Sequence, residues 1–365
     1  MTMETIHQMF FKNSTDMCEI ESNTIDLIIT SPPYPMIEMW DLLFSSLNGE
    51  IKKALQQEEG YNAFNLMHEE LDKVWKESVR VLKKGGIACI NIGDATRKIR
   101  KNFQLFPNHI RITDFFQNNG FSVLPCILWR KPTNSPNKFL GSGMLPPNAY
   151  ITLEHEYILV FRKGDNKREI APKSEDRYNS AYFWEERNKW FSDVWIDIRG
   201  VAQSLNNNKN SKLRERSAAF PLELPYRLIN MFSIYGDTVL DPFWGTGTTS
   251  LAAMISARNS IGYEINSEFM ELFRRNARKI KQLVKSINSE RLNQHTEFII
   301  RYKKEGRNVN YNSINYKFPV ITQQEKNLLL YSISNYYEKE NKYIVNHKRF
   351  DYNHKKNLVQ SDLIS

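Results

Sequence analysis

Apolar runs and amphipathic stretches alternate along most of the chain. Helical spacing of apolar residues over 71–82 and 110–116 predicts two helices, and the Lys-Lys-Gly-Gly sequence at 83–86 predicts the end of the first. Four largely apolar runs predict buried strands, at residues 25–29, 87–94, 121–129 and 154–163. Helix followed by strand across a short link is half of a βαβ unit, so the pattern predicts an α/β fold with a mostly parallel sheet.

The same alternation returns after residue 219. Residues 220–232 predict a helix with early prolines, which leads into strands at 237–241 and 259–266. Residues 267–287 predict one long amphipathic helix, because apolar positions recur every three or four residues and acidic side chains fill its first turn. Residues 36–44 are amphipathic enough for a further helix.

Clear periodicity fails in four stretches. Residues 95–108 are basic and predict a solvated surface loop, with phosphate contact as the alternative. Residues 136–150 are rich in Pro, Asn and Gly and predict a loop. Residues 164–216 combine cations, clustered aromatic rings and an Asn-rich run at 206–210, which suits either DNA reading or a small local core. Residues 288–365 predict some folded structure, and their role stays open between DNA binding, dimer support and neither.

Two consecutive prolines end the first predicted strand. Pro32 and Pro33 lack the N–H that a central strand needs, so the chain leaves the sheet in a stiff, extended loop. This loop presents the Ser31 hydroxyl and the Tyr34 ring at the carboxyl edge of the sheet, where open α/β folds bind ligands. An ordinary strand-ending turn has the same pattern. Asp94 ends another predicted strand and either lines the same pocket or serves a turn.

A glycine-rich turn follows the strand at 237–241. Gly245 and Gly247 permit tight geometry and close approach of a ligand to the backbone, and a helix that begins near Thr248 offers free N–H groups to an anion. Asp241 at the strand tip can accept hydrogen bonds from an amino group, and Glu264 ends the next strand where an acidic side chain binds ribose hydroxyls. A Walker loop is disfavoured because Thr248 stands where that loop has Lys.

The two motifs together resemble the signature pair of the DNA amino-methyltransferases. Those enzymes methylate N4 of cytosine or N6 of adenine with S-adenosylmethionine. Because the catalytic motif precedes the cofactor motif, the order resembles that of the permuted β-class, and the resemblance covers roughly residues 10–285. It implies a Rossmann-like, seven-stranded, mostly parallel sheet with helices on both faces, an inserted target recognition region and a C-terminal extension.

The resemblance also implies domain limits and site residues. Residues 1–163 would be the catalytic part, 164–216 the target recognition insert, 217–287 the cofactor-binding part and 288–365 an extension of unknown role. The implied catalytic residues are Ser31, Pro32, Pro33 and Tyr34. The implied cofactor-binding residues are Asn13, Ser14, Asp241, Pro242, Phe243, Gly245, Thr246, Gly247, Thr248, Thr249 and Glu264.

The first motif suits methyl transfer to an exocyclic amine. Such an amine is a poor nucleophile because its lone pair is delocalised into the ring. The Ser31 hydroxyl and the Pro32 carbonyl could accept its N–H groups and favour a more tetrahedral nitrogen. Tyr34 would stack on a base flipped out of the duplex.

Carbon methylation and metal chemistry find less support. A cytosine-C5 enzyme needs an attacking thiolate, but Cys126 lies inside an apolar strand pattern, where a buried and inert thiol is expected. No metal site is expected, since His155-Glu156 lacks a second His four residues after the first and no cysteine pair has ligand spacing.

Bulk properties place few further limits. The chain has 365 residues, 41% hydrophobic and 25% charged, and three isolated cysteines, which predicts a soluble protein of a reducing compartment. It carries no apolar run long enough for a membrane span, and residues 1–12 lack the layout of a signal peptide, so a bacterial or archaeal cytoplasm is expected. A net charge of +9 makes a polyanion a plausible partner.

These observations favour a cytosine-N4 methyltransferase acting on double-stranded DNA. Ser31 favours cytosine because family members with Ser at that position usually act on cytosine, and adenine-N6 is the alternative. Methylation of RNA or protein amines fits less well, and a non-catalytic DNA-binding relative is the alternative of another class. A cognate restriction endonuclease and a homodimer are further expectations, while the recognition sequence stays unknown.

Overall fold

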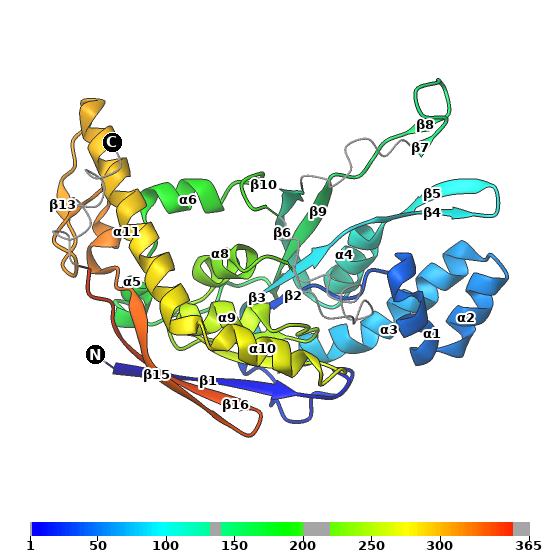
Figure 1. Cartoon of the computed structure of the whole chain (residues 1–365), viewed down its shortest axis with the longest axis horizontal. Helices are drawn as coiled ribbons and strands as arrows, with labels where there is room; N and C mark the ends of the chain where they lie inside the picture. The colour runs from blue at the N-terminus through cyan, green and yellow to red at the C-terminus, as the bar shows by residue number, and fades with distance from the viewer. Residues whose placement is uncertain (1, 132–139, 200–219, 353–365) are drawn as a thin grey trace.

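The computed structural model describes residues 2–131, 140–199 and 220–352. Its centre is a ten-stranded sheet with the order β10-β6-β9-β3-β2-β11-β12-β1-β16-β15 (Figure 1). The strands are β1 (Thr2–Phe10), β2 (Ile25–Thr30), β3 (Leu82–Ile92), β6 (Phe121–Arg130), β9 (His155–Lys163), β10 (Val194–Trp195), β11 (Thr238–Asp241), β12 (Asn259–Tyr263), β15 (Tyr331–Lys339) and β16 (Lys342–Arg349). Among the described helices, none combines the length and the apolar content that a membrane crossing requires.

The middle of this sheet is parallel. Strands β3, β2, β11, β12 and β1 pair in parallel, whereas β9 runs antiparallel to both β3 and β6. These seven strands confirm the predicted α/β fold with a mostly parallel sheet. The sheet is nevertheless wider than predicted, because β10 extends one edge and the antiparallel pair β15–β16 extends the other.

Helices cover both faces of the sheet, as predicted. Alternate strand residues point to opposite faces, so Leu27 and Ile29 pack into one core with helices α8, α9, α10 and α11, and Ile28 packs into the other with α1 to α4. The helices are α1 (Asp41–Leu47), α2 (Gly49–Gln56), α3 (Gly60–Val81), α4 (Asn108–Asn118), α5 (Glu175–Asn179), α6 (Trp184–Trp190), α8 (Glu223–Phe232), α9 (Thr248–Ile255), α10 (Phe269–Ala277) and α11 (Ile280–Lys304), with 3-10 turns η1 (Glu38–Trp40) and η2 (Gln323–Asn327).

The prediction of a basic surface loop at 95–108 was wrong. Strands β4 (Ala95–Ile99) and β5 (Asn102–Phe106) form a hairpin, and α4 begins just after it. Ile99 and Phe106 anchor the hairpin against Gly60, where an added Cβ would lie 3.0 and 3.1 Å from them. Apolar and polar residues alternate only weakly in these two short strands, and the cations among them made the segment resemble a solvated loop. Two further hairpins are β7 (Leu140–Gly141) with β8 (Ala149–Tyr150) and β13 (Tyr311–Asn312) with β14 (Pro319–Val320).

Two helix ends also differ from prediction. Residues 83–86 are not a link but the start of β3, where a register shift absorbs Gly85 at φ +74°. The predicted helix 267–287 is split into α10 and α11. The split lets Phe273 of α10 pack between Trp244 and Tyr343, while Asn288 of α11 donates to the Tyr331 carbonyl (2.7 Å).

The described part of the predicted insert, 164–199, packs into the main body. Trp190 and Trp195 are buried in the core beside α8, and Phe183 is buried against the C-terminal segment. These rings therefore serve a core, which was one of the two expected roles. The Asn-rich run at 206–210 and residues 136–139 of the predicted loop lie outside the described residues. Because β15 and β16 belong to the central sheet, the segment after residue 288 is in part integral to the fold.

Candidate active site at the carboxyl edge of the sheet

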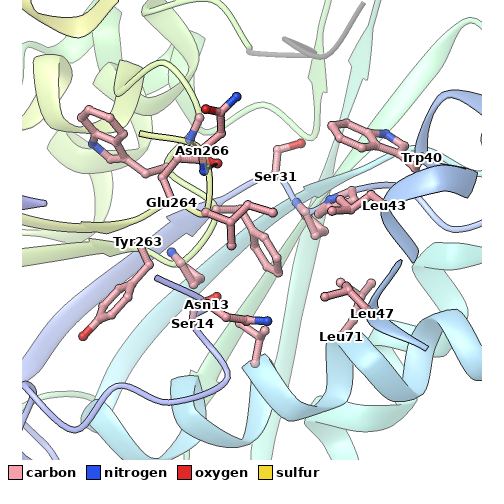
Figure 2. A pocket seen from close by; sticks show the side chains of 18 of the residues that line it. Asn13, Ser14, Ser31, Trp40, Leu43, Leu47, Leu71, Tyr263, Glu264 and Asn266 are labelled. Carbon is pink, nitrogen blue, oxygen red and sulfur yellow. Dashed lines mark hydrogen bonds between the residues drawn. The ribbon is translucent and has the colours of Figure 1, made fainter. Parts of the chain in front are cut away.

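The two motifs meet at neighbouring strand ends. β2 and β11 pair in parallel, with Leu27 opposite Val239 and Ile28 opposite Leu240, so the loops that follow them leave the same edge. Both loops line one cavity of about 860 Å³. Figure 2 shows Ser31 and Glu264 across this cavity from one another, with Leu43, Leu47 and Leu71 along a further wall. The spatial arrangement that the sequence predicted is therefore present.

Most of the predicted cofactor residues line this cavity. They are Asn13, Ser14, Asp241, Pro242, Phe243, Gly245, Thr246, Thr248 and Glu264. Gly247 and Thr249 lie outside the lining and support it instead. Gly247 is the N-cap of α9 with φ +78°, and the Thr249 hydroxyl donates to Asp241 Oδ2 (2.6 Å). Of the predicted catalytic residues, Ser31, Pro32 and Pro33 line the cavity and Tyr34 does not.

Asp241 is a buried carboxylate held from both sides. Thr30 donates to Oδ1 (2.7 Å) and Thr249 to Oδ2 (2.6 Å), while the backbone N–H of Phe243 also donates to Oδ1 (3.1 Å). Burial raises the pKa of Asp241 from 3.8 to about 6, although these hydrogen bonds oppose the rise. Each carboxylate oxygen has two lone-pair sites, so the group retains capacity for a ligand donor.

Glu264 organises the glycine turn from the next strand. Its Oε2 accepts from the Gly245 N–H and its Oε1 from the Asn266 N–H, both at 2.9 Å. Burial raises the pKa of Glu264 above its ordinary value. On the same side of the cavity, the Asn13 side chain accepts from the Thr15 N–H (3.0 Å) and so holds the loop that carries the buried Ser14.

A hydrogen-bonded cluster surrounds Ser31. The Tyr34 hydroxyl donates to Glu156 Oε2 (2.9 Å) and lies 3.1 Å from the Ser31 hydroxyl. Asn91 Nδ2 donates to the same tyrosine oxygen (2.9 Å) and to Glu156 (2.7 Å), and Lys131 forms an ion pair with Glu156. Burial and the nearby Glu156 raise the pKa of Tyr34 well above its ordinary value.

Sequence reasoning missed three members of this cluster. Asn91 lies on β3, which read as an apolar run. Glu156 lies on β9, in the 154–163 strand that the family resemblance places next to the target-base pocket, although no role was assigned to Glu156 itself. Lys131 follows β6 directly. A polar side chain inside an otherwise apolar strand is the signal that could have found the first two. Asp94, by contrast, accepts from the backbone N–H and ring Nδ1 of His109 at the start of α4 and does not line the cavity.

The apolar walls of the cavity come from helices whose contribution was not predicted. Leu43 and Leu47 of α1, together with Leu71 and Val74 of α3, face it beside Phe243. Cys126 is half-buried among core residues and is not part of the lining, so the site offers no thiol among the residues that the structure describes. The cavity thus combines apolar walls, the buried carboxylate of Asp241, the half-buried carboxylate of Glu264 and one hydroxyl that is held by a polar cluster.

Comparison with known proteins gives one consistent picture. Residues 25–275 match a family model described as DNA methylase, of the N6/N4 type. The Type II methyltransferase M.MthZI of Methanothermobacter thermautotrophicus is 56% identical over 90% of this chain and 91% of its own. M.MjaI of Methanocaldococcus jannaschii is 55% identical over 72% of this chain and 88% of its own. A solved structure of a DNA modification methylase from Thermus thermophilus, complexed with S-adenosyl-L-methionine, is 30% identical with a TM-score of 0.58 and covers 75% of this chain and 94% of its own.

Proposed function

Because the chain belongs to the N6/N4 DNA methylase family of S-adenosylmethionine-dependent enzymes, we propose that it methylates the exocyclic N4 of cytosine in double-stranded DNA. The observation that carries this proposal is the shared cavity, in which the Ser31 loop and the Gly245 turn face one another. Methyl transfer requires the base and the cofactor to lie next to one another, and one cavity lined by both motifs meets that requirement.

The cavity suits S-adenosylmethionine in size and in the chemistry of its lining. Its volume of about 860 Å³ falls within the range of ligand pockets. Glu264 would accept hydrogen bonds from ribose hydroxyls, Asp241 from the amino group of the methionine part, and the turn before α9 would offer N–H groups to the carboxylate. Apolar side chains such as Phe243 and Val74 would contact the adenine. When bound, the cofactor supplies an electrophilic methyl group.

The hydrogen bonds around Ser31 support its role as an acceptor. The Tyr34 hydroxyl gives its own proton to Glu156 and receives a hydrogen bond from Asn91. Its remaining lone pair can accept the Ser31 O–H at 3.1 Å. Ser31 Oγ would then present lone pairs to an N–H of the target amine, with the Pro32 carbonyl as the second acceptor. Asn91 and Glu156 are positioning residues in this scheme, because they act through Tyr34.

Cytosine is favoured over adenine by Ser31 at the first position of the motif. The alternative is methylation of adenine at N6, for which a purine in place of a pyrimidine would have to fit beside Tyr34 and Glu156. The proposed site residues remain those of the two motifs, and residues 1–163 and 217–287 would carry the catalytic and cofactor-binding parts. Tyr34, which does not line the cofactor cavity, is proposed to stack on the flipped base.

The names of the two archaeal relatives extend the proposal to a biological setting. Both are Type II methyltransferases, so we propose that this enzyme protects specific DNA sites from a cognate restriction endonuclease in a cytoplasm. A homodimer remains a prediction.

Nucleoside mass spectrometry tests the chemistry directly. Double-stranded plasmid DNA is incubated with the protein and methyl-labelled S-adenosylmethionine, and the DNA is digested to nucleosides. The label is expected in N4-methylcytosine. Label in N6-methyladenine would move the assignment to the alternative base, and label in neither base of DNA, but in RNA or protein supplied in parallel, would refute the proposed substrate class.

A further inference from the structure

Two hairpins project from the same edge of the sheet as the candidate site. Hairpin β4–β5 begins three residues after Ile92, the last residue of β3, and so follows Asn91 closely. Hairpin β7–β8 lies between β6 and β9, the strand on which Glu156 lies. In Figure 1 the β7–β8 hairpin projects at the upper right of the molecule, and the β4–β5 hairpin lies below it, above α1 and α2. Each is therefore tied by a short piece of chain to the polar cluster around Ser31.

The two hairpins contact one another. The rings of Phe103 on β5 and Tyr150 on β8 stack with their centroids 4.4 Å apart and their planes at 19°. Within hairpin β7–β8 the Tyr150 ring packs against Gly141, where an added Cβ would lie 2.7 Å from the ring and a φ of +71° suits glycine. Arg97 on β4 forms a two-bond ion pair with Asp41 of α1 at 2.8 and 2.7 Å. The hairpins thus form one braced unit rather than two independent loops.

The tip of β7–β8 is apolar and faces solvent. Met144 is 83% exposed and Leu145 is 71% exposed, and Ile151 at the base of the hairpin is 87% exposed. The Ser142 N–H donates to the Asn148 carbonyl (2.9 Å), so the tip has internal hydrogen bonds that hold its shape. Adjacent large apolar side chains that a fold holds in water mark a contact surface for another molecule.

The neighbouring tip of β4–β5 is cationic. Lys98 and Lys101 are exposed, and within the described residues neither has a carboxylate at ion-pair distance. Arg100 between them is 3.7 Å from Glu58, a long and exposed pair. Unpaired cations beside an apolar tip fit duplex DNA better than a protein partner. The cations can bind backbone phosphates, and apolar side chains can insert between neighbouring base pairs.

We infer that the β7–β8 tip inserts Met144 and Leu145 between base pairs of the DNA beside the target base, while Lys98 and Lys101 contact phosphates. This inference rests on the proposed function, since the enzyme must take its target base out of the stack. The wedge offsets part of the lost stacking and holds the duplex open next to the cluster around Ser31. The occupant is duplex DNA, and a second copy of the chain is the competing outcome.

The cations are tested by the salt dependence of DNA binding. Each lost phosphate contact lowers the slope of log K against log salt by about one, so Lys98→Gln with Lys101→Gln should lower it by about two. The matched control is Lys339→Gln with Lys342→Gln, the same charge change in hairpin β15–β16 on the other edge of the sheet. An unchanged slope for the first pair, or an equal change for both pairs, overturns the phosphate contacts.

The wedge is tested on one plasmid in relaxed and in negatively supercoiled form. Met144→Ser with Leu145→Ser should lower the methylation rate on relaxed DNA by about tenfold or more, and supercoiling should restore part of it because it eases base opening. S-adenosylmethionine affinity should not change. The control, Ile300→Ser with Ile314→Ser, removes two exposed apolar side chains elsewhere and should have little effect.

The outcomes separate the inference from the proposed function. If the wild type transfers no label to DNA, the proposed function fails, whatever the variants do. If the wild type is active and the tip variant loses equal rate on both plasmid forms, or none, the wedge is refuted. The tip variant could instead change the sedimentation of the free protein while its methylation rate does not depend on whether the plasmid is relaxed or supercoiled. That result would assign the tip to contact between two copies of the chain and would also overturn the inference.

Discussion

Asp241 shows how a single buried side chain can link cofactor binding to pH. Its carboxylate is enclosed by Thr30 and Thr249, and burial raises its pKa to about 6. The pKa of Asp241 in the folded protein lies above the ordinary value of 3.8, so the fold is more stable when this carboxyl is protonated. This stabilisation is present in full below pH 3.8 and is lost as the pH rises through about 6. A cationic amino group of a bound cofactor would offset that cost.

The affinity for S-adenosylmethionine should therefore rise with pH. Protonated Asp241 is a weaker acceptor for the amino group, so affinity should strengthen as the pH increases from about 5 to about 7. Asp241→Asn keeps the shape and removes the charge. It should bind at least about tenfold more weakly at neutral pH and lose this pH dependence. Isothermal titration calorimetry across the range checks both, and a wild-type affinity that does not change with pH contradicts the role.

The elements near the cavity show which parts of the fold a sequence can and cannot predict. Largely apolar runs such as residues 25–29 predicted the strands reliably, because strands buried on both faces consist mainly of apolar residues. The one polar residue of this run, Asp26, is paired with Lys83 and Arg168. Hairpin β4–β5 was missed because its short strands are anchored by few apolar residues and carry cations on the rest. The split between α10 and α11 was missed because it depends on where Phe273 packs, which is a tertiary contact.

The candidate site follows the same division. Residues of the two motifs could be predicted because they stand at strand ends and in a glycine turn with a local chemical meaning. Asn91 and Glu156 stood out in the sequence only as polar residues within apolar strands, and their role arises where β3 and β9 pair beside β2. The apolar wall from α1 and α3 likewise depends on how these helices lie against the sheet.

Packing between β12 and the glycine turn provides a test at the level of elements. An added Cβ on Gly262 would lie 2.1 Å from Trp244 Cδ1, and Trp244 is buried against Phe273 with its indole N–H on Ser250 (2.8 Å). Gly262→Ala should displace the indole, cost about 1–3 kcal/mol of unfolding free energy and weaken cofactor binding.

Gly49→Ala is the matched control for that change. Gly49 opens α2, and an added Cβ there meets nothing within 4 Å. Its stability should stay the same or rise slightly, since alanine is the better helix former. Urea unfolding and calorimetry of the two variants give the comparison, and equal effects would show that the Gly262 contact does not support the turn.

At the scale of the whole molecule, the C-terminal segment is fastened to the body by ion pairs. Arg291 of α11 binds Glu186 of α6, and His295 bridges Glu185 (2.9 Å) and the Pro319 carbonyl (2.9 Å). Both His295 nitrogens face acceptors, an arrangement that favours the charged form of the ring. Burial lowers the pKa of His295, but Glu185 outweighs it, and the pKa lies above 6.5.

This arrangement predicts that stability falls as the pH rises above 6.5. Because the folded pKa is raised, the stabilisation is present in full below pH 6.5 and is lost as the pH rises through the raised value. His295→Gln should unfold more easily than the wild type by about 3 kcal/mol at low pH, and the difference should shrink as the pH rises. Thermal unfolding across this range measures it, and a difference that does not vary with pH contradicts the charged form.

The central claim is that two segments about 200 residues apart in the sequence form one reaction centre, and Ser31→Ala tests it most directly. The variant is loaded with labelled S-adenosylmethionine, mixed with plasmid DNA and followed through a single turnover, with cofactor and DNA affinities measured beside it. The account predicts near wild-type affinities and a rate of label transfer lower by about a hundredfold, since an acceptor placed for the transition state is lost. A wild-type transfer rate, or equal losses in affinity and rate, would contradict it.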